Sequence, residues 1–211
     1  MPAQVSESFV LRTYPFQEAD LIVSFFTRDH GKLRGVAKRA RRPKSAFGAG
    51  LERLSHVRMA YFRRENADLA SLSSCEVIES GFSQHSDYGR SLALDYMTEV
   101  SEQLLPQQEP NEKFFRLLLS MRESLTAGGE LWPVIDYFSL WAVRLTGVLP
   151  ELRVSDETGE IVGEMFAKPI SGLSPRVWNK STLSSLRRSL IRAIEQHVER
   201  KLLTVPLLEA L

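Results

Sequence analysis

Hydrophobic and polar residues follow two different periods along the chain, and the change between them lies near residue 80. Before that point short apolar segments alternate with turn-forming residues, and within one segment Val57, Met59 and Tyr61 occupy every second position. This period of two is typical of a strand with one buried face. Five short antiparallel strands suit a small barrel, and the OB-type barrel commonly binds single-stranded nucleic acid. The predicted strands fall in residues 6–14, 20–28, 31–40, 54–62 and 68–78.

Two glycines in the strand region carry specific expectations. Gly31 follows His30 where the second and third segments meet, which predicts a tight turn. Gly35 interrupts the alternation of the third segment, which predicts a bulge in that strand.

After about residue 86 the apolar residues recur every three or four positions, which indicates helices. Leu92, Tyr96, Val100 and Leu104 form a stripe at steps of four, and Asp87 is the expected N-cap of that helix. Proline and glycine positions mark the ends of the others. Further helices are predicted from Pro110 to Gly128, over residues 130–147, as a short element opening at Ser174, and over residues 183–198.

The sequence therefore predicts an α+β protein with two domains. Residues 1–82 are expected to form a five-stranded OB-type β-barrel, and residues 83–211 an all-helical domain with an irregular segment near 150–173. That segment is either a mobile polar loop or is ordered by packing. The residues available for such packing are Ile161, Met165, Phe166 and Ile170.

Composition adds a compartment and a charge pattern to this picture. The 211 residues include a single cysteine, Cys75, so no internal disulfide can form, which fits a reducing compartment. No apolar run reaches the roughly 18 residues that span a bilayer, so we expect a soluble cytoplasmic protein with no membrane partner. The net charge is +1, but residues 1–80 carry +4, residues 81–164 carry −8 and residues 165–211 carry +5. This segregation favours a polyanion-binding module at the N-terminal end.

The positive charge of the N-terminal region is concentrated in one run. Seven cations fall within thirteen residues, and no acidic residue occurs from His30 to Leu51. So many like charges repel one another unless an anion binds, and a phosphate backbone is the natural partner. A solvated loop and a localisation signal are alternative interpretations of such a run. The predicted DNA-binding residues are Lys32, Arg34, Lys38, Arg39, Arg41, Arg42, Lys44 and Phe47.

Three aromatic residues near this run are candidates for stacking on bases. Phe47 lies just beyond the run, and Tyr14 and Phe16 are expected in the loop between the first two strands. Base stacking on aromatic side chains is how many single-strand-binding surfaces work. For each of the three, packing in the core is an equally good interpretation.

No catalytic machinery is evident in the sequence. The Lys-Ser pairs at Lys44 and Lys180 lack the glycines of a G-x-x-x-x-G-K-[ST] loop, which excludes nucleotide hydrolysis by that route. The four histidines are dispersed and form no metal-binding pattern. We therefore expect no catalytic residues, no cofactor and no metal site, and we do not expect an enzyme.

The stretch from Val10 to Ser55 resembles the N-terminal domain of the RecO recombination mediators of bacteria. The resemblance includes an R-x-x-x-x-x-E-x-D opening, a T-x-x-x-G turn and a basic A-K-G-A-R-R-x-K-S signature. The matching residues are Arg12, Glu18 and Asp20 for the first, Thr27 and Gly31 for the second, and Ala37, Lys38, Ala40, Arg41, Arg42, Lys44 and Ser45 for the third.

Two departures from the family pattern bear on structure. Arg39 replaces the usual glycine of the basic signature, which adds charge but removes backbone freedom. Many relatives carry two C-x-x-C pairs that bind zinc, whereas here Ser155 and Thr158 stand in the region of the first pair and nothing matches the second. Hydroxyl groups do not ionise near neutral pH, so the protein is expected to fold without zinc.

The resemblance implies a DNA repair and recombination mediator associated with the nucleoid. Such proteins bind single-stranded and double-stranded DNA, anneal complementary strands, and act with RecR to load recombinase onto DNA coated by the single-strand-binding protein. They also recognise the acidic, phenylalanine-ended C-terminal tail of the single-strand-binding protein, a contact that needs cations beside an apolar slot. The candidate cations for this contact are Arg187, Arg188 and Arg192.

Two other functions remain open at this point. One is a general OB-type nucleic-acid-binding protein, for RNA for example, without mediator activity. The other is a nucleic-acid-modifying enzyme whose site the sequence does not reveal. Strand annealing would separate the first from a mediator, and metal-dependent turnover of DNA would identify the second.

Overall fold

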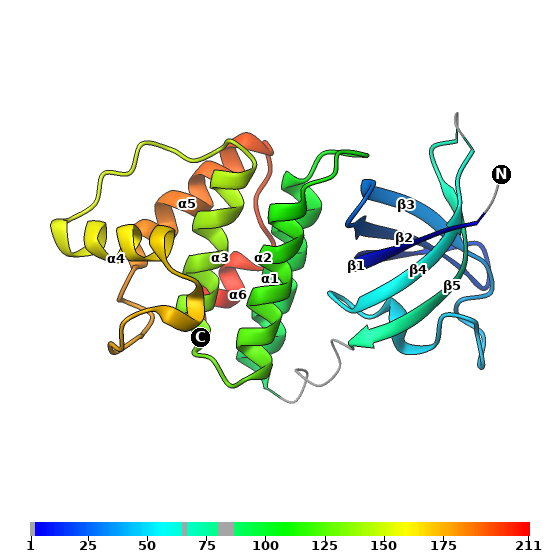
Figure 1. Ribbon diagram of the computed structural model, residues 1–211, viewed down its shortest axis with the longest axis horizontal. Coiled ribbons are helices and arrows are strands. Elements are labelled where there is room, and N and C mark those ends of the chain that lie inside the picture. The colour runs from blue at the N-terminus through cyan, green and yellow to red at the C-terminus, as the bar shows by residue number, and fades with distance from the viewer. Residues whose placement is uncertain (1–2, 65–66, 80–86) are drawn as a thin grey trace. The chain divides into compact units, whose positions relative to one another are not determined.

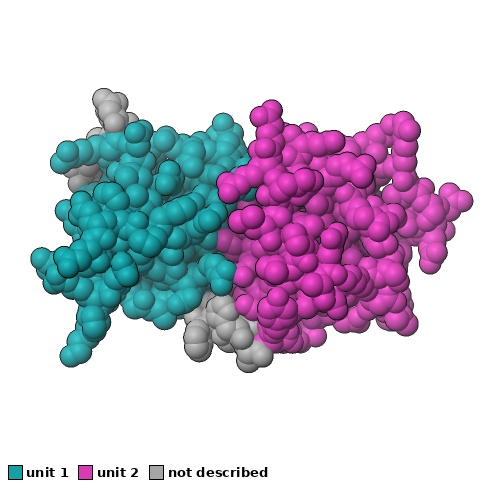
Figure 2. Space-filling view, turned by 180° about the vertical axis from the view of Figure 1, so that it is seen from behind, with its two compact units in different colours: residues 1–86, 101–115 teal, residues 87–100, 116–211 magenta. Residues whose placement is uncertain are grey.

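The computed structural model describes residues 3–64, 67–79 and 87–211 (Figure 1). Two compact units are present (Figure 2). The barrel unit comprises residues 1–86 and 101–115, and the helical unit comprises residues 87–100 and 116–211. The predicted domain boundary between residues 82 and 83 lies outside the described residues.

The N-terminal strands form a closed barrel in the order β1-β2-β3-β5-β4. All neighbouring pairs are antiparallel except β3 and β5, which are parallel. This arrangement and the helices that follow it confirm the predicted α+β class with an OB-type barrel. The strands are β1 (Gln4–Phe16), β2 (Asp20–Thr27), β3 (Gly31–Ala37), β4 (His56–Phe62) and β5 (Ala70–Glu79), with a short 3-10 helix η1 (Gly48–Leu51) between β3 and β4.

The barrel core follows from the alternation of apolar residues. Val57, Met59 and Tyr61 of β4 are all fully buried, as the period of two predicts. Gly31 has φ of 72°, so the predicted tight turn is present. The bulge predicted at Gly35 is wrong, because Gly35 pairs regularly with Val23. Gly35 instead permits a close approach, since a Cβ atom there would lie 2.7 Å from the Leu72 side chain.

A bulge does occur in β1, and it determines which side chains face outward. The register shifts between Val10 and Arg12, so Leu11 is the extra residue. Successive residues of a strand point to opposite faces of the sheet. One extra residue therefore reverses which positions after it face outward and which face inward. Phe9 faces outward before the bulge, whereas Arg12 and Tyr14 face outward after it.

Residues 101–115 cover part of the outer surface of the barrel. They comprise the end of α1 (Tyr88–Leu104), the loop after it and the first turn of α2 (Glu112–Thr126). Phe115 packs against Phe9, and Phe114 packs edge-on against Phe26, with ring centroids 4.9 and 6.0 Å apart. Asn111 accepts a bond from the Phe114 amide and is the N-cap of α2, so Pro110 precedes the cap instead of lying in the first turn.

The helical unit adds elements that the sequence pattern did not predict. Its remaining helices are α3 (Leu131–Leu145), α4 (Asp156–Ala167), η3 (Ile170–Gly172), α5 (Ser184–His197) and α6 (Val205–Glu209). The expectation of an irregular segment near 150–173 is wrong, because that segment contains α4. The short helix predicted at Ser174 is absent, since residues 173–179 contain no helix. Among the described residues no helix is long and apolar enough to cross a membrane.

Capping and packing order α4. The Ser155 hydroxyl accepts a hydrogen bond from the Thr158 amide at 3.3 Å and caps the helix. Ile161 and Met165 are buried on its inner face. Glu164 holds the following chain, because its carboxylate accepts bonds from the Ser174 hydroxyl, Lys168 and the Ser174 amide, which lower its pKa to about 2.

Candidate nucleic-acid interface

The outer face of β1, β2 and β3 carries polar and aromatic side chains in register, of which Ser24 is buried and donates a hydrogen bond to Glu102. Arg12 pairs with Ser24, and Ser24 pairs with Arg34, so these three residues form one row across the strands. Residues that pair across neighbouring strands share a face of the sheet. Tyr14 belongs to the next row, where it pairs with Ile22.

Tyr14 lies between two arginines on this face. The guanidinium carbon of Arg12 is 5.1 Å from the centroid of the Tyr14 ring, and that of Arg34 is 5.6 Å from it. Both arginines are exposed and the tyrosine is half-buried. Guanidinium planes and aromatic rings both stack on bases, and the guanidinium groups also pair with phosphate. This face can therefore contact a nucleic-acid strand through both its bases and its backbone.

The loop that follows β3 carries the densest positive charge of the barrel unit. We call residues 38–44 the basic turn, and its five cations are all exposed. The start of β2 and the residue before it hold the basic turn in place: Asp20 Oδ1 accepts a bond from the Arg39 amide at 2.7 Å, and the Ala19 carbonyl accepts one from the Arg41 amide at 3.0 Å. The cations are Lys38, Arg39, Arg41, Arg42 and Lys44.

The backbone of Arg39 has a conformation that glycine adopts more easily than other residues. Its φ is 55°, in the left-handed region that costs a side chain roughly 1–2 kcal/mol. The bond from Asp20 offsets part of that strain and fixes the turn. The structure therefore keeps a glycine-like conformation while adding a cation at the turn.

Two of the predicted DNA contacts are buried, and the prediction is wrong for them. Lys32 is 6% exposed, and its ammonium group donates to the main-chain carbonyl of Glu102. Burial lowers the pKa of Lys32, although the nearby Glu102 carboxylate opposes that shift. Phe47 is 3% exposed and belongs to the barrel core, with its carbonyl accepting a bond from Cys75. Neither side chain can contact a nucleic-acid strand on the surface.

The sequence analysis missed Arg12 as a contact residue, although a signal was available. Phe9, Val10 and Leu11 are three consecutive apolar residues, and in a regular strand they cannot all face one side. All three are fully buried, because Leu11 is the bulged residue and Phe9 is covered by Phe115. Three consecutive apolar residues indicate a bulge, after which the alternation of inward and outward residues is reversed. That reversal places Arg12 on the outer face.

The three predicted partner-binding arginines lie on α5. Of these, only Arg188 is both exposed and part of the lining of a pocket. Arg187 lines the pocket, but it is 7% exposed and donates two bonds of 2.7 Å to Asp136. It also donates to the Lys180 carbonyl and stacks on Trp132 at 4.2 Å. Arg188 is exposed and lines the pocket, whereas Arg192 is exposed but does not line it.

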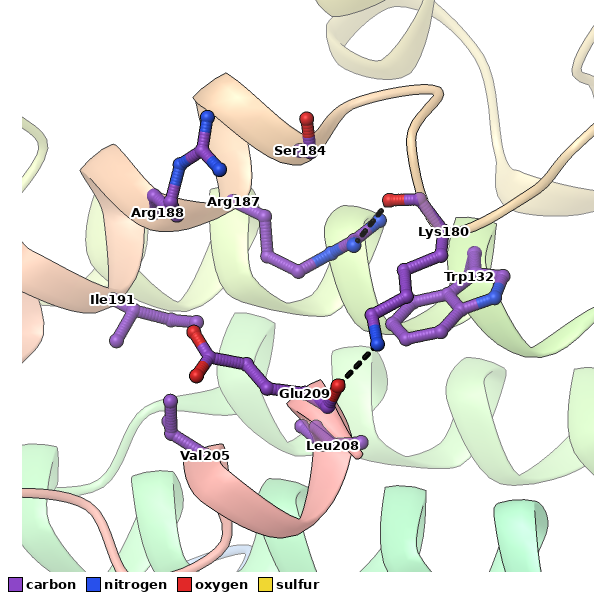
Figure 3. Close-up of a pocket in the computed structure, with 9 residues that line it drawn as sticks. All are labelled: Trp132, Lys180, Ser184, Arg187, Arg188, Ile191, Val205, Leu208 and Glu209. Atoms are coloured by element: carbon purple, nitrogen blue, oxygen red, sulfur yellow. Dashed lines mark hydrogen bonds between the residues drawn. The ribbon is translucent and has the colours of Figure 1, made fainter. Parts of the chain in front are cut away.

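This pocket combines an apolar wall with three cationic side chains and one carboxylate, that of Glu209 (Figure 3). Its volume is about 90 Å³. Trp132 comes from α3 and Leu208 from α6, and they face the cationic side chains from α5 and the loop before it. Lys180 closes one side by donating to the main-chain carbonyl of Glu209. An acidic peptide that ends in an apolar side chain has the chemistry to bind here.

The described residues contain little that resembles a reactive site. Among residues 3–64, 67–79 and 87–211, no three His, Cys, Asp or Glu side chains lie together in a group that could hold a metal ion. Burial raises the pKa of the Cys75 thiol to about 11, so it is protonated at neutral pH and a poor nucleophile.

Comparison with known proteins points to one family. The family profile described as "Recombination protein O N terminal" matches residues 1–81, and "Recombination protein O C terminal" matches residues 85–173. The DNA repair protein RecO of Koribacter versatilis is 38% identical, over 98% of this chain and 98% of its own length.

More distant relatives match over less of their length. The DNA repair protein RecO of Bifidobacterium adolescentis is 34% identical over 82% of this chain and 72% of its own length. The protein of the same name from an Anaeromyxobacter species is 30% identical over 74% of this chain, and the match spans 61% of that relative.

Proposed function

Because the chain belongs to the RecO family of DNA repair and recombination proteins, we propose that it binds single-stranded DNA through its barrel and anneals complementary strands. One observation carries this proposal: five exposed cations of the basic turn lie on the same barrel as the exposed Arg12 and Arg34 with Tyr14 between them. The proposed DNA contacts are therefore the basic turn together with Arg12, Tyr14 and Arg34.

Annealing places two demands on such a surface. Phosphate repulsion between two strands must be neutralised, and the base edges must stay free to pair. The arginines and lysines of the basic turn meet the first demand by releasing counterions. Stacking on Tyr14 would hold a base by its face and leave its edge exposed, which meets the second. Phosphate contacts of this kind are independent of sequence, so double-stranded DNA is a second, non-specific ligand.

The proposed partners are RecR and the acidic C-terminal tail of the single-strand-binding protein. With RecR, the protein would load recombinase onto DNA coated by the single-strand-binding protein. The pocket in the helical unit supports the tail contact, because Arg188 lines it together with Trp132, Ile191 and Leu208. These groups would bind the carboxylates and the terminal aromatic ring of the tail.

The proposed activity is tested by annealing two complementary labelled oligonucleotides. The protein should accelerate annealing of the bare strands, and it should also anneal strands that the single-strand-binding protein coats. A protein that binds RNA strands tightly but accelerates neither reaction would be a general nucleic-acid-binding protein instead, and the proposal would be rejected.

The tail contact makes a separate prediction. Arg188→Glu should lower the affinity for a labelled tail peptide by roughly tenfold or more, because a like charge would face the peptide carboxylates. Fluorescence anisotropy with the peptide measures this directly. Arg200→Glu, which reverses an exposed charge that does not line the pocket, is the matched control and should bind as the unmodified protein does. If the unmodified protein and both variants bind the peptide with equal affinity, the pocket is not the binding site for the tail.

A further inference from the structure

A cavity opens on the barrel unit directly beside the basic turn. Its volume is about 420 Å³, within the range of roughly 300–1,000 Å³ that is typical of sites for small organic ligands. Ala40, which belongs to the basic turn, forms part of its lining. Arg12, whose guanidinium group stacks on Tyr14, forms another part. The cavity is therefore continuous with the surface already described.

Three apolar side chains form part of the cavity lining, and we call them its floor. Leu21, Ala40 and Leu51 line it, and each is a partly buried side chain that packs against the barrel core. Apolar floors with a few polar groups at the rim are characteristic of sites for flat organic rings. A floor of this kind gives no favourable contact to a bare phosphate or to a hydrated ion.

The segment from η1 to Leu54 forms one wall of the cavity. This segment is fixed to the barrel at both of its ends. Leu54 is fully buried with φ of 54°, and its amide donates to the Val10 carbonyl at 2.8 Å. The Val10 amide in turn donates to the Ser55 carbonyl at 3.1 Å. At the other end, Gly50 lies so close to Cys75 that a Cβ atom would be 2.2 Å from the sulfur. The cavity is therefore formed before any ligand binds.

The rim of the cavity carries both signs of charge. Arg12 and Arg53 line it and attract the backbone of a nucleic-acid strand. Glu52 also lines it, and a carboxylate disfavours a phosphate group inside the cavity. The same carboxylate can accept a hydrogen bond from the exocyclic amino group of a base. The arrangement thus suits a ring that is attached to a phosphate which remains outside.

We propose that this cavity receives one unstacked base of the single strand whose phosphates contact the basic turn. The inference rests on the proposed DNA binding and adds a site for a base to it. A base in a duplex is paired and stacked, and extruding it costs free energy. The cavity therefore gives the barrel a preference for single strands, which phosphate contacts alone do not provide.

The test separates contacts with bases from contacts with phosphates. Affinities are measured for two strands of equal length, one with normal bases and one made of abasic residues. Thr13 lines the cavity from β1, and Thr13→Trp should fill it. This variant should lose roughly five- to tenfold in affinity for the normal strand, and it should bind the abasic strand as the unmodified protein does. The dependence of binding on salt should not change for either strand.

Two further variants keep the test decisive. Phe62→Trp adds the same side chain at an exposed position of β4 outside the cavity, and it should bind both strands normally. If Thr13→Trp fails to fold, Leu51→Ala removes part of the floor and should also weaken binding of the normal strand alone. Unchanged affinity of the cavity variants for the normal strand would overturn the inference. Salt-independent binding of both strands by the unmodified protein would instead reject the proposed DNA surface.

Discussion

Replacing Lys38, Arg39, Arg41 and Arg42 of the basic turn with alanine is expected to abolish most of the affinity for single-stranded DNA. Each phosphate contact contributes about 0.7 to the slope of log K against log salt concentration, so the slope should flatten by up to roughly 3. At physiological salt this corresponds to a loss of about 100-fold in affinity. The barrel should still fold, because all four side chains are exposed.

A second quadruple variant controls for the change in net charge. Arg58, Arg153, Arg200 and Lys201 are exposed cations outside the basic turn, and their replacement by alanine removes the same four charges. This variant should keep nearly all of the salt dependence. If the two quadruple variants lose the same affinity, the effect is one of overall charge and the basic turn is not the contact surface.

Breaking the buried ion pair of the helical unit is expected to have the largest effect on stability. Asp136 is fully buried and Arg187 nearly so, and two hydrogen bonds of 2.7 Å join them. Burial raises the pKa of the Asp136 carboxyl, and the paired guanidinium opposes that rise. Asp136→Ala would leave a buried cation without its partner, so the free energy of unfolding should fall by about 3–5 kcal/mol.

The measurement can be confined to the helical unit. All three tryptophans of the chain, Trp132, Trp141 and Trp178, belong to that unit, so their fluorescence in urea reports its unfolding alone. The double variant Asp136→Leu with Arg187→Met replaces the pair by apolar side chains of similar volume. It should be clearly more stable than Asp136→Ala. If Asp136→Ala unfolds at the same urea concentration as the unmodified protein, the ion pair does not contribute to the stability of the helical unit.

The sequence predicted the barrel well because its strands have one buried face. Alternating apolar positions such as Val57, Met59 and Tyr61 report burial directly, and turn residues such as Gly31 separate the strands. The bulge was misplaced at Gly35, because a glycine that permits close packing and a glycine in a bulge look alike in a sequence.

The helical unit was predicted less completely. Its long helices have clear apolar stripes, but α4 has only twelve residues, four of which are acidic. Its order depends on contacts between distant residues, such as the bonds from Ser174 to Glu164. Ser155 was interpreted as the replacement of a zinc ligand, and the structure shows that it caps the helix. The cap is a local signal, because Ser155 directly precedes two acidic residues of a first helical turn, whereas the bonds from Ser174 are not visible in a local pattern.

The candidate site was predicted in outline but not residue by residue. The charge run correctly indicated an exposed basic surface, because the acidic residues that usually accompany a solvated face are missing from it. The sequence could not show that Lys32 points at Glu102 or that Phe47 enters the core, since both depend on where the strand turns. The sequence likewise could not show that Arg187 is paired with Asp136, because the two residues lie 51 positions apart.

The most direct test of the central claim is the rate at which two complementary oligonucleotides anneal with the unmodified protein and with the quadruple variant of the basic turn. We expect strong acceleration by the unmodified protein. The basic-turn variant should give little or none at physiological salt, while the control variant at Arg58, Arg153, Arg200 and Lys201 stays close to the unmodified protein. Acceleration by the basic-turn variant equal to that of the unmodified protein would contradict the assignment of strand annealing to this surface of the barrel.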